Sequence, residues 1–125
     1  MKQKKYKDSK AFLEAKKLLG SDFLYNQEYK ITNVDGIPVT VEVDIVIPSH
    51  SIGIEVDGDH HLEKSRIKKD NHKDMQLYVL YGLKVFRVTD DKAKTDYIVN
   101  FVKQLKNVSP LQLAIFNLFK TIANI

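Results

Sequence analysis

The chain has 125 residues, a formal net charge of +4 and no cysteine. This length predicts one domain with a core of its own, and the lack of cysteine excludes disulfides, thiolate metal sites and a cysteine nucleophile. The charged amino terminus has no apolar run behind it, and polar residues interrupt the most apolar segment, 111–125. We therefore expect no signal peptide, no membrane span and a cytoplasmic location.

The first expected element is a helix over residues 9–19. Ser9 is a suitable N-cap, and Gly20 supplies a stop. Between them, apolar residues recur at helical spacing: Phe12, Ala15 and Leu19. Glu14 lies mid-helix and off this apolar stripe. It is either a solvent-facing side chain or a contributor to a site elsewhere in the fold.

A strand over residues 25–32 is expected next, followed by a turn with two competing geometries. A two-residue Asp35-Gly36 loop would turn Glu28 and Lys30 toward the core. A three-residue loop over 34–36, with Gly36 in the left-handed conformation, turns apolar side chains inward instead. We expect the three-residue loop, because it agrees with the hydrophobic pattern.

The most informative stretch is a hairpin formed by residues 39–47 and 52–56, with Pro48-Ser49-His50-Ser51 as its loop. In this register Asp44 lies opposite Glu55, and directly opposed Cβ atoms are about 4.5–5.5 Å apart. Side chains alternate along a strand, so one face is expected to be entirely β-branched. The other face would gather four carboxylates: Glu42, Asp44, Glu55 and Asp57.

Opposed carboxylates destabilise a sheet unless they are solvated, protonated or bound to a cation. Oxygen ligands at this spacing suit a hard divalent ion, Mg²⁺ or Mn²⁺. The alternative is an ordinary hairpin with a polar outer face. The regular apolar alternation fixes the register, and this favours the metal site.

The remaining chain predicts a helix over 63–81 ended by Gly82, a buried strand over 84–88, a helix over 95–105, and a last helix after Ser109-Pro110. On the 63–81 helix, Leu77 and other apolar residues are expected to face the core, with the charged residues outside. Arg87 lies inside the buried strand, so we expect an acid to pair with it. The order of elements predicts an α/β sandwich with a mixed sheet.

Basic residues flank the acidic hairpin on both sides. Residues 1–19 hold seven lysines and two acids, and a second group follows the hairpin: Lys64, Arg66, Lys68, Lys69 and Lys73. Positive segments around an acidic cluster favour a nucleic acid partner held through its phosphates, with chemistry at the acids. The alternative is that these lysine-rich faces are merely solvated by water. The case for this alternative is strongest for the first ten residues of the chain.

In this order the motifs resemble those of the PD-(D/E)XK nuclease superfamily, and most closely its small domains related to very-short-patch repair endonucleases. The resemblance covers about residues 9–90. Its pieces are Glu14, Asp44-Ile45-Val46-Ile47-Pro48, Ile54-Glu55-Val56-Asp57-Gly58-Asp59-His60-His61, the helix segment Asp70–Leu77, and Gly82-Leu83-Lys84-Val85-Phe86-Arg87. It implies a restriction-endonuclease-like αβββαβ core, with residues 1–8 as a basic arm and 91–125 as added C-terminal helices.

The resemblance also implies roles for individual residues. Asp44 and Glu55 would bind Mg²⁺ or Mn²⁺, with the Val56 carbonyl as a further ligand. Asp57 stands where many members have a catalytic lysine, and His61, with His60 as second choice, would assist the attacking water. Either histidine could instead cap the next helix or contact phosphate. Glu14 would complete the metal site, and Lys73 replaces a family arginine.

The expected activity is Mg²⁺-dependent hydrolysis of DNA phosphodiester bonds by an endonuclease. Because the motif lysine is missing, a catalytically weak or inactive nucleic-acid-binding module of the same fold stays open. A third reading is a different phosphoester enzyme on a similar hairpin. The apolar last helix is expected either to form a homodimer contact or to cover the sheet of its own chain.

Overall fold

The computed structural model describes residues 5–57, 64–109 and 111–112 of the chain. Within these ranges the fold consists of four strands, four α-helices and three short 3₁₀ turns. In chain order these are η1 (Lys5–Asp8), α1 (Lys10–Leu19), η2 (Gly20–Asp22), β1 (Leu24–Thr32), β2 (Pro38–Ile47), η3 (Pro48–His50), β3 (Ile52–Asp57), α2 (Lys64–Tyr81), β4 (Lys84–Thr89), α3 (Asp90–Ala93) and α4 (Asp96–Lys106). The expected helices and strands begin and end within about two residues of these bounds.

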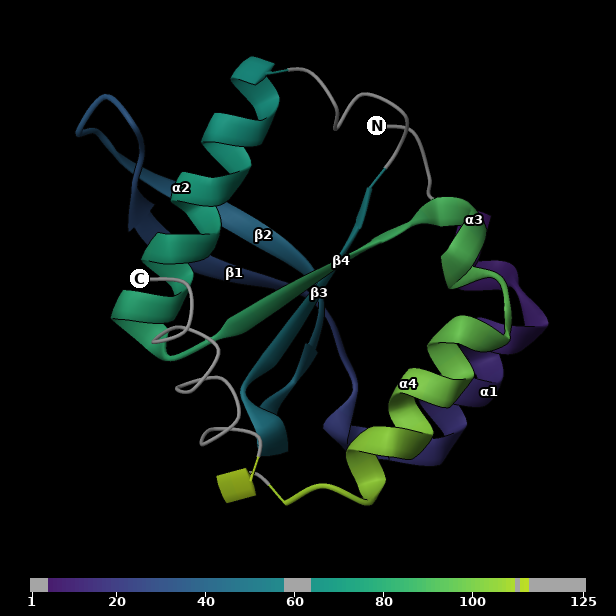
Figure 1. Ribbon diagram of the computed structural model, residues 1–125. Helices are drawn as coiled ribbons and strands as arrows, with labels where there is room; N and C mark the ends of the chain where they lie inside the picture. Colours follow the sequence, from purple (N-terminus) through teal and green to yellow (C-terminus); the bar gives the residue numbers. More distant parts are fainter. Residues whose placement is uncertain (1–4, 58–63, 110, 113–125) are drawn as a thin grey trace.

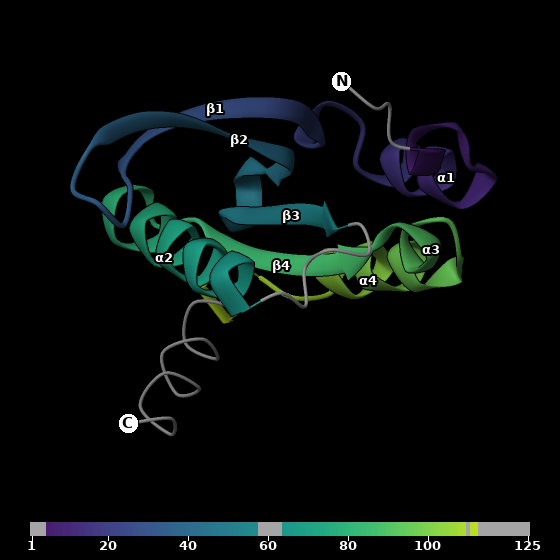
Figure 2. The ribbon, with the colours of Figure 1, turned by 90° about the horizontal axis from the view of Figure 1, so that it is seen from above.

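The four strands form one open, mixed sheet in the order β1-β2-β3-β4. β1 and β3 pair antiparallel with β2, whereas β4 runs parallel to β3. Helices cover both faces: α2 lies on one side, and α1, α3 and α4 lie on the other (Figures 1 and 2). The expected α/β architecture with a mixed sheet is therefore confirmed.

The ends of α1 follow from its sequence. The Ser9 side chain accepts a hydrogen bond from the backbone N–H of Phe12 (3.1 Å), which satisfies a donor at the start of the helix. Gly20 ends the helix with a φ of 58°, a conformation that glycine adopts without steric cost. Phe12 and Ala15 of this helix are fully buried against the core.

The turn between β1 and β2 is the expected three-residue loop. The Asn33 N–H donates to the Ile37 carbonyl oxygen (2.9 Å), and this bond closes the loop around residues 34–36. Gly36 has a φ of 80°. The register that results pairs Tyr29 with Val41 and Ile31 with Val39.

The hairpin of β2 and β3 also has the expected register, with Ile47 opposite Ile52 and Ile45 opposite Ile54. The loop Pro48–His50 forms a 3₁₀ turn, and Ser51 leaves it with a φ of 52°. Gly53 lies opposite Val46, where a Cβ atom would stand 3.0 Å from Cγ1 of Val43 and 3.1 Å from Cδ2 of Leu83. A side chain at this position would displace the packing on the α2 side of the sheet.

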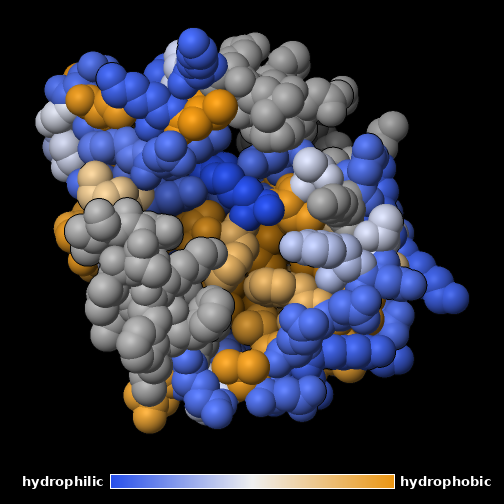
Figure 3. All heavy atoms as spheres, in the orientation of Figure 1, coloured by the Kyte–Doolittle hydropathy of each residue, from blue (hydrophilic) through white to orange (hydrophobic). Residues whose placement is uncertain are grey.

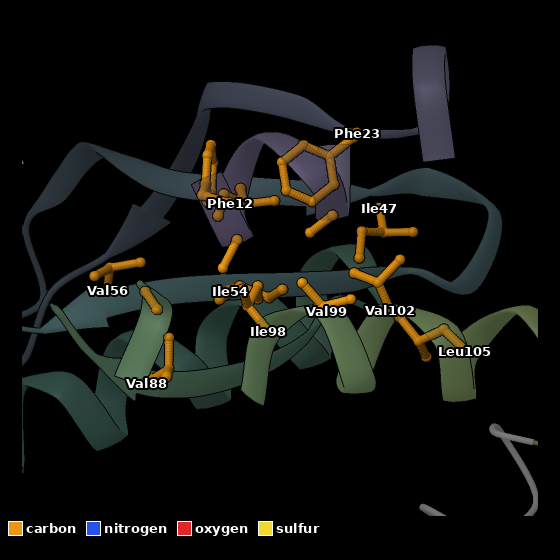
Figure 4. Close-up of a cluster of buried hydrophobic side chains, with 14 of the residues drawn as sticks. Phe12, Phe23, Ile47, Ile54, Val56, Val88, Ile98, Val99, Val102 and Leu105 are labelled. Carbon is orange, nitrogen blue, oxygen red and sulfur yellow. The ribbon is translucent and has the colours of Figure 1, made fainter. Parts of the chain in front are cut away.

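One expectation for the hairpin is wrong: its apolar residues do not share a single face. Ile45, Ile47, Ile52, Ile54 and Val56 pack with α1 and α4 in one core (Figure 4). Val43, expected on the same face, instead packs with Ile31, Val46, Leu77 and Leu83 in a second core beneath α2. The switch coincides with Asn26 on β1, which has a φ of 52° and interrupts the β1–β2 ladder between the pairs Tyr25–Ile45 and Gln27–Val43. A local break in the pleat reverses which residues point to which face.

The face that α2 presents to the sheet is also different from the expected one. Leu77 is buried, but Ile67 and Tyr78 are 41% and 47% exposed. The charged residues expected outside contact the sheet instead, through Lys73 and Asp74. The sheet carries charged side chains at this point, so complementary charges on the helix replace the usual apolar stripe.

The end of the described chain packs on the α1 side. α4 begins after Thr95, whose side chain accepts a hydrogen bond from the Tyr97 N–H (3.3 Å), and it buries Ile98, Val99 and Val102. The Ser109 side chain accepts a hydrogen bond from the Gln112 N–H (3.1 Å), which is the contact expected of an N-cap. The last helix expected after Ser109-Pro110 lies almost entirely outside the described residues.

β4 forms one edge of the sheet. On this side of the molecule, hydrophilic side chains lie over α2 and α4, and apolar side chains lie between them along β4 (Figure 3). Among the described residues, no helix combines the length and apolar character that crossing a membrane would require.

Candidate functional site

The two acids at the centre of the hairpin lie close together and are buried. Asp44 is 8% exposed and Glu55 is 6% exposed. The recorded pairing of β2 with β3 ends at Ile45 and Ile54. One step further along, Oδ2 of Asp44 accepts a hydrogen bond from the backbone N–H of Val56 (2.8 Å). The Asp44 side chain therefore accepts a bond from a backbone N–H of β3, and this bond fixes its carboxylate beside β3.

The Glu55 carboxyl group is strongly perturbed. Burial raises its pKa, and although Lys73 lowers it, the neighbouring Asp44 carboxylate raises it further, to about 7. Two carboxylates this close do not both ionise readily in a buried setting unless a positive charge accompanies them. A raised carboxyl pKa in a cluster of charged groups is typical of functional sites.

The positive charge beside Glu55 comes from α2. The Lys73 ammonium donates to Oε1 of Glu55 at 2.6 Å and to the backbone carbonyl oxygen of Glu42 at 3.0 Å. The side chain is 22% exposed, so it reaches the site from a half-buried position. Lys73 thereby links α2 to both strands of the hairpin.

Arg87 on β4 is the centre of a second group of charges. It makes a bidentate pair with Asp74 (2.7 and 3.0 Å), a hydrogen bond to Asp57 (3.1 Å) and a longer contact to Asp70 (3.6 Å). Burial alone would lower the pKa of Arg87, but these carboxylates raise it above its ordinary value. The expectation that an acid would pair with this arginine is confirmed.

Together the two groups form a layer of charged side chains between α2 and the sheet. This layer, which we call the polar layer, contains two cations and five carboxylates: Lys73, Arg87, Asp44, Glu55, Asp57, Asp70 and Asp74. If all were ionised, its formal charge would be −3. A pocket of about 260 Å³ opens beside it, between β4 and the first half of α2, with Asp57, Asp70 and Arg87 in its wall. The excess of carboxylates makes this layer a place where a further cation is favoured.

The other predicted site residues differ in how close they lie to the acidic pair. Asp57 is bound to Arg87. Glu14 is exposed on α1, the helix on the opposite face of the sheet from Lys73, and no recorded hydrogen bond or ion pair joins it to Asp44 or Glu55. His60 and His61 lie outside the described residues. Of the basic group, only Lys73 reaches the acids, and four members are exposed on α2: Lys64, Arg66, Lys68 and Lys69.

Sequence reasoning missed two members of the polar layer, Asp70 and Asp74. A usable signal was present: Asp70, Lys73, Asp74 and Leu77 follow one another at spacings of three, one and three residues along α2, so they share one helical face. The arginine expected inside β4 required acids to pair with it, and this face of α2 could supply them.

The donors at Asp44 and Glu55 are hard oxygens, the type that Mg²⁺ and Mn²⁺ prefer. Mg²⁺ is commonly held by one or two carboxylates, with water and substrate oxygens completing its shell. Among the described residues, no group of three or more histidines, cysteines, aspartates and glutamates is arranged to hold a metal. Within these residues, Asp44 and Glu55 would therefore supply two carboxylates to such an ion, and water or substrate would have to complete its shell.

The raised pKa of Glu55 predicts a pH-dependent stability. The folded chain holds this proton more tightly than the unfolded chain, whose glutamate titrates near 4.5. The stability that the proton contributes is therefore complete below about pH 4.5 and is lost as the pH rises through about 7. Between pH 5 and pH 8 we expect the free energy of unfolding to fall by about 2 kcal/mol more in the parent than in Glu55→Gln.

Urea unfolding at both pH values measures this difference. Glu28→Gln, which changes an exposed glutamate on β1, is the matched control and should retain the parent's pH dependence. An equal pH dependence in the parent and in Glu55→Gln would contradict the assignment of the titration to Glu55.

Comparison with family models, with curated proteins and with solved structures finds no match to this chain.

Proposed function

We propose that the protein is a metal-dependent endonuclease that hydrolyses phosphodiester bonds in DNA. The observation that carries this proposal is the pair of buried carboxylates, Asp44 and Glu55, held beside each other where β2 and β3 part. A fold gains no stability from placing two acids together in this way, so the arrangement favours a role in binding a cation.

The resemblance to the PD-(D/E)XK superfamily supports the same proposal. The α-helices and strands as far as β4 follow one another in the order helix, three strands, helix, strand, which is the order that the resemblance implies. Asp44 and Glu55 stand on the central hairpin of this arrangement. By the same resemblance, the fold would be restriction-endonuclease-like, and the last helices would be additions to it.

Asp44, Glu55 and the Val56 carbonyl would hold the metal ion. Once bound, such an ion lowers the pKa of a water molecule and neutralises charge that develops on the phosphate. Asp44 is already oriented for this by its hydrogen bond from the Val56 N–H. His61, or His60 in second place, would accept the proton of the attacking water.

The DNA would be held by the exposed basic residues on the first half of α2. Lys64, Arg66 and Lys68 project from the same helix that carries Lys73 to the acids, so phosphates bound by them would lie near the polar layer. Removing all three, in a Lys64→Ala, Arg66→Ala, Lys68→Ala variant, should lower the slope of log affinity against log salt by about 2 to 3. Fluorescence anisotropy with a labelled duplex measures this slope, and an unchanged slope would place the DNA elsewhere.

The activity itself is tested with supercoiled plasmid in the presence of Mg²⁺ or Mn²⁺, with EDTA and Glu55→Ala as controls. We expect nicked or linear product only with a divalent ion and only from the parent protein. The absence of cleavage under every metal, with salt-dependent DNA binding retained, would replace the proposal by its alternative.

That alternative is a nucleic-acid-binding module without hydrolytic activity. One observation favours it specifically: the Glu55 carboxylate is already paired with the Lys73 ammonium, and Asp57 is already paired with Arg87. In such a module the charges of the polar layer would serve only to hold α2 on the sheet.

A further inference from the structure

The Lys73 ammonium stands where a cation at the acidic pair would make its contact with Glu55. Its 2.6 Å bond goes to Oε1 of Glu55, whose side chain is only 8% exposed. A lysine ammonium is a compact charge with three donors and no acceptor. It therefore supplies to this carboxylate the positive charge that the Asp44–Glu55 pair requires.

Lys73 also has a second acceptor outside the acidic pair. Its ammonium donates to the Glu42 carbonyl oxygen at 3.0 Å. This acceptor is a backbone oxygen of β2, two residues before Asp44, so the ionisation of Asp44 or Glu55 does not change it. If the bond to Glu55 were broken, the ammonium would keep a partner and remain next to the site.

We propose that Lys73 is an internal competitor for the divalent ion: it holds Glu55 when no metal is bound, and it must release that carboxylate for the ion to bind. This inference rests on the proposed function, because it takes Asp44 and Glu55 as the metal ligands. It adds that the affinity of the site is set by a residue on α2, the same helix that offers the basic residues to DNA.

Competition predicts that removing the ammonium tightens metal binding. Lys73→Met keeps most of the length and packing of the side chain but has no charge and no donor. A charge-assisted hydrogen bond that no longer has to be broken corresponds to a gain in Mn²⁺ affinity of about ten- to a hundredfold. Lys73→Arg keeps the charge and can hold the carboxylate through two donors, so it should bind Mn²⁺ no more tightly than the parent.

Lys69→Met is the matched control. Lys69 lies one turn before Lys73 on α2, is exposed and forms no ion pair with another residue of the described ranges, so this variant removes the same charge without removing the contact to Glu55. Isothermal titration with Mn²⁺ at pH 8, without DNA, measures the affinity of the parent, of Lys73→Met, Lys73→Arg and Lys69→Met, and of Glu55→Gln. Circular dichroism establishes that each of them is folded.

The expected result is tighter binding by Lys73→Met alone. Unchanged or weaker binding by Lys73→Met would overturn the inference, and so would an equal gain in Lys69→Met, which would show a general effect of charge. If Lys73→Met does not fold, Lys73→Arg decides: tighter binding by that variant contradicts competition, whereas equal or weaker binding agrees with it.

The outcomes also separate this inference from the proposed function. If the parent binds Mn²⁺, Glu55→Gln abolishes this binding and Lys73→Met does not tighten it, only the competition is overturned. Absence of Mn²⁺ binding in the parent and in the Lys73 variants overturns the metal assignment, and the competition with it. Binding by Lys73→Met but not by the parent supports competition in its strongest form.

Discussion

Asp44→Asn is expected to reduce metal-dependent cleavage of plasmid by about a hundredfold to a thousandfold while leaving the protein folded. Asparagine keeps an acceptor oxygen for the Val56 N–H, which Asp44 now binds at 2.8 Å. It removes the negative charge that a divalent ion requires, and a metal ion contributes several kcal/mol to the stabilisation of charge in a transition state. The change therefore separates the chemical role of this side chain from its structural role.

Stability is expected to respond differently from activity. Asp44 raises the pKa of Glu55, so removing one charge of this pair relieves repulsion and should not lower the free energy of unfolding by more than about 1 kcal/mol. Glu42→Gln is the matched control, since it changes an exposed acid two residues away on the same strand. It should cleave at the parent's rate. A folded Asp44→Asn protein that retains the parent's cleavage rate would refute the assignment of Asp44 as a metal ligand.

Arg87→Met is expected to cause the largest loss of stability, about 2 to 4 kcal/mol. The guanidinium binds Asp74 at 2.7 and 3.0 Å and Asp57 at 3.1 Å, and all of these side chains are half-buried. Without the guanidinium, Asp57 and Asp74 lose the positive charge that pairs with both of them, and they repel each other. For a domain of this size the loss should lower the midpoint of thermal unfolding by about 10 °C.

Two comparisons make the Arg87 prediction specific. Arg66→Met removes an exposed arginine from α2 and should change the stability by less than about 0.5 kcal/mol. Adding Asp57→Asn and Asp74→Asn to Arg87→Met should restore part of the loss, because the repelling charges are then absent. Equal losses in Arg87→Met and Arg66→Met, or no recovery in the triple variant, would show that the pairing of Arg87 contributes little.

The local structure follows closely from local sequence. Ser9 and Gly20 bound α1, Gly36 fixes the three-residue turn, and the register of the β2–β3 hairpin follows from its loop. Each of these depends on residues within a few positions of one another, through capping, backbone conformation and alternation. The neighbourhood of Asp44 and Glu55 belongs to the same category, because their spacing across the hairpin is set by its register.

The orientation of α2 could not be obtained from its own sequence. Helical periodicity ranks the faces of a helix by hydrophobicity, and on that basis the charged residues were expected outside. In the structure, Lys73 and Asp74 face the sheet because Glu55 and Arg87 stand there to receive them. The choice depends on charges that are 13 to 18 residues away in the chain, and periodicity contains no information about them.

The sequence by itself determined the main helices and strands, the mixed sheet and the position of an acidic pair on its central hairpin, because these depend on short-range patterns. Only the tertiary structure decided that the apolar residues of β2 divide between two cores, that Lys73 occupies Glu55, and that Arg87 collects three acids. The physical reason is that burial and the pairing of charges are properties of surfaces that meet, and which surfaces meet depends on packing across the whole sheet.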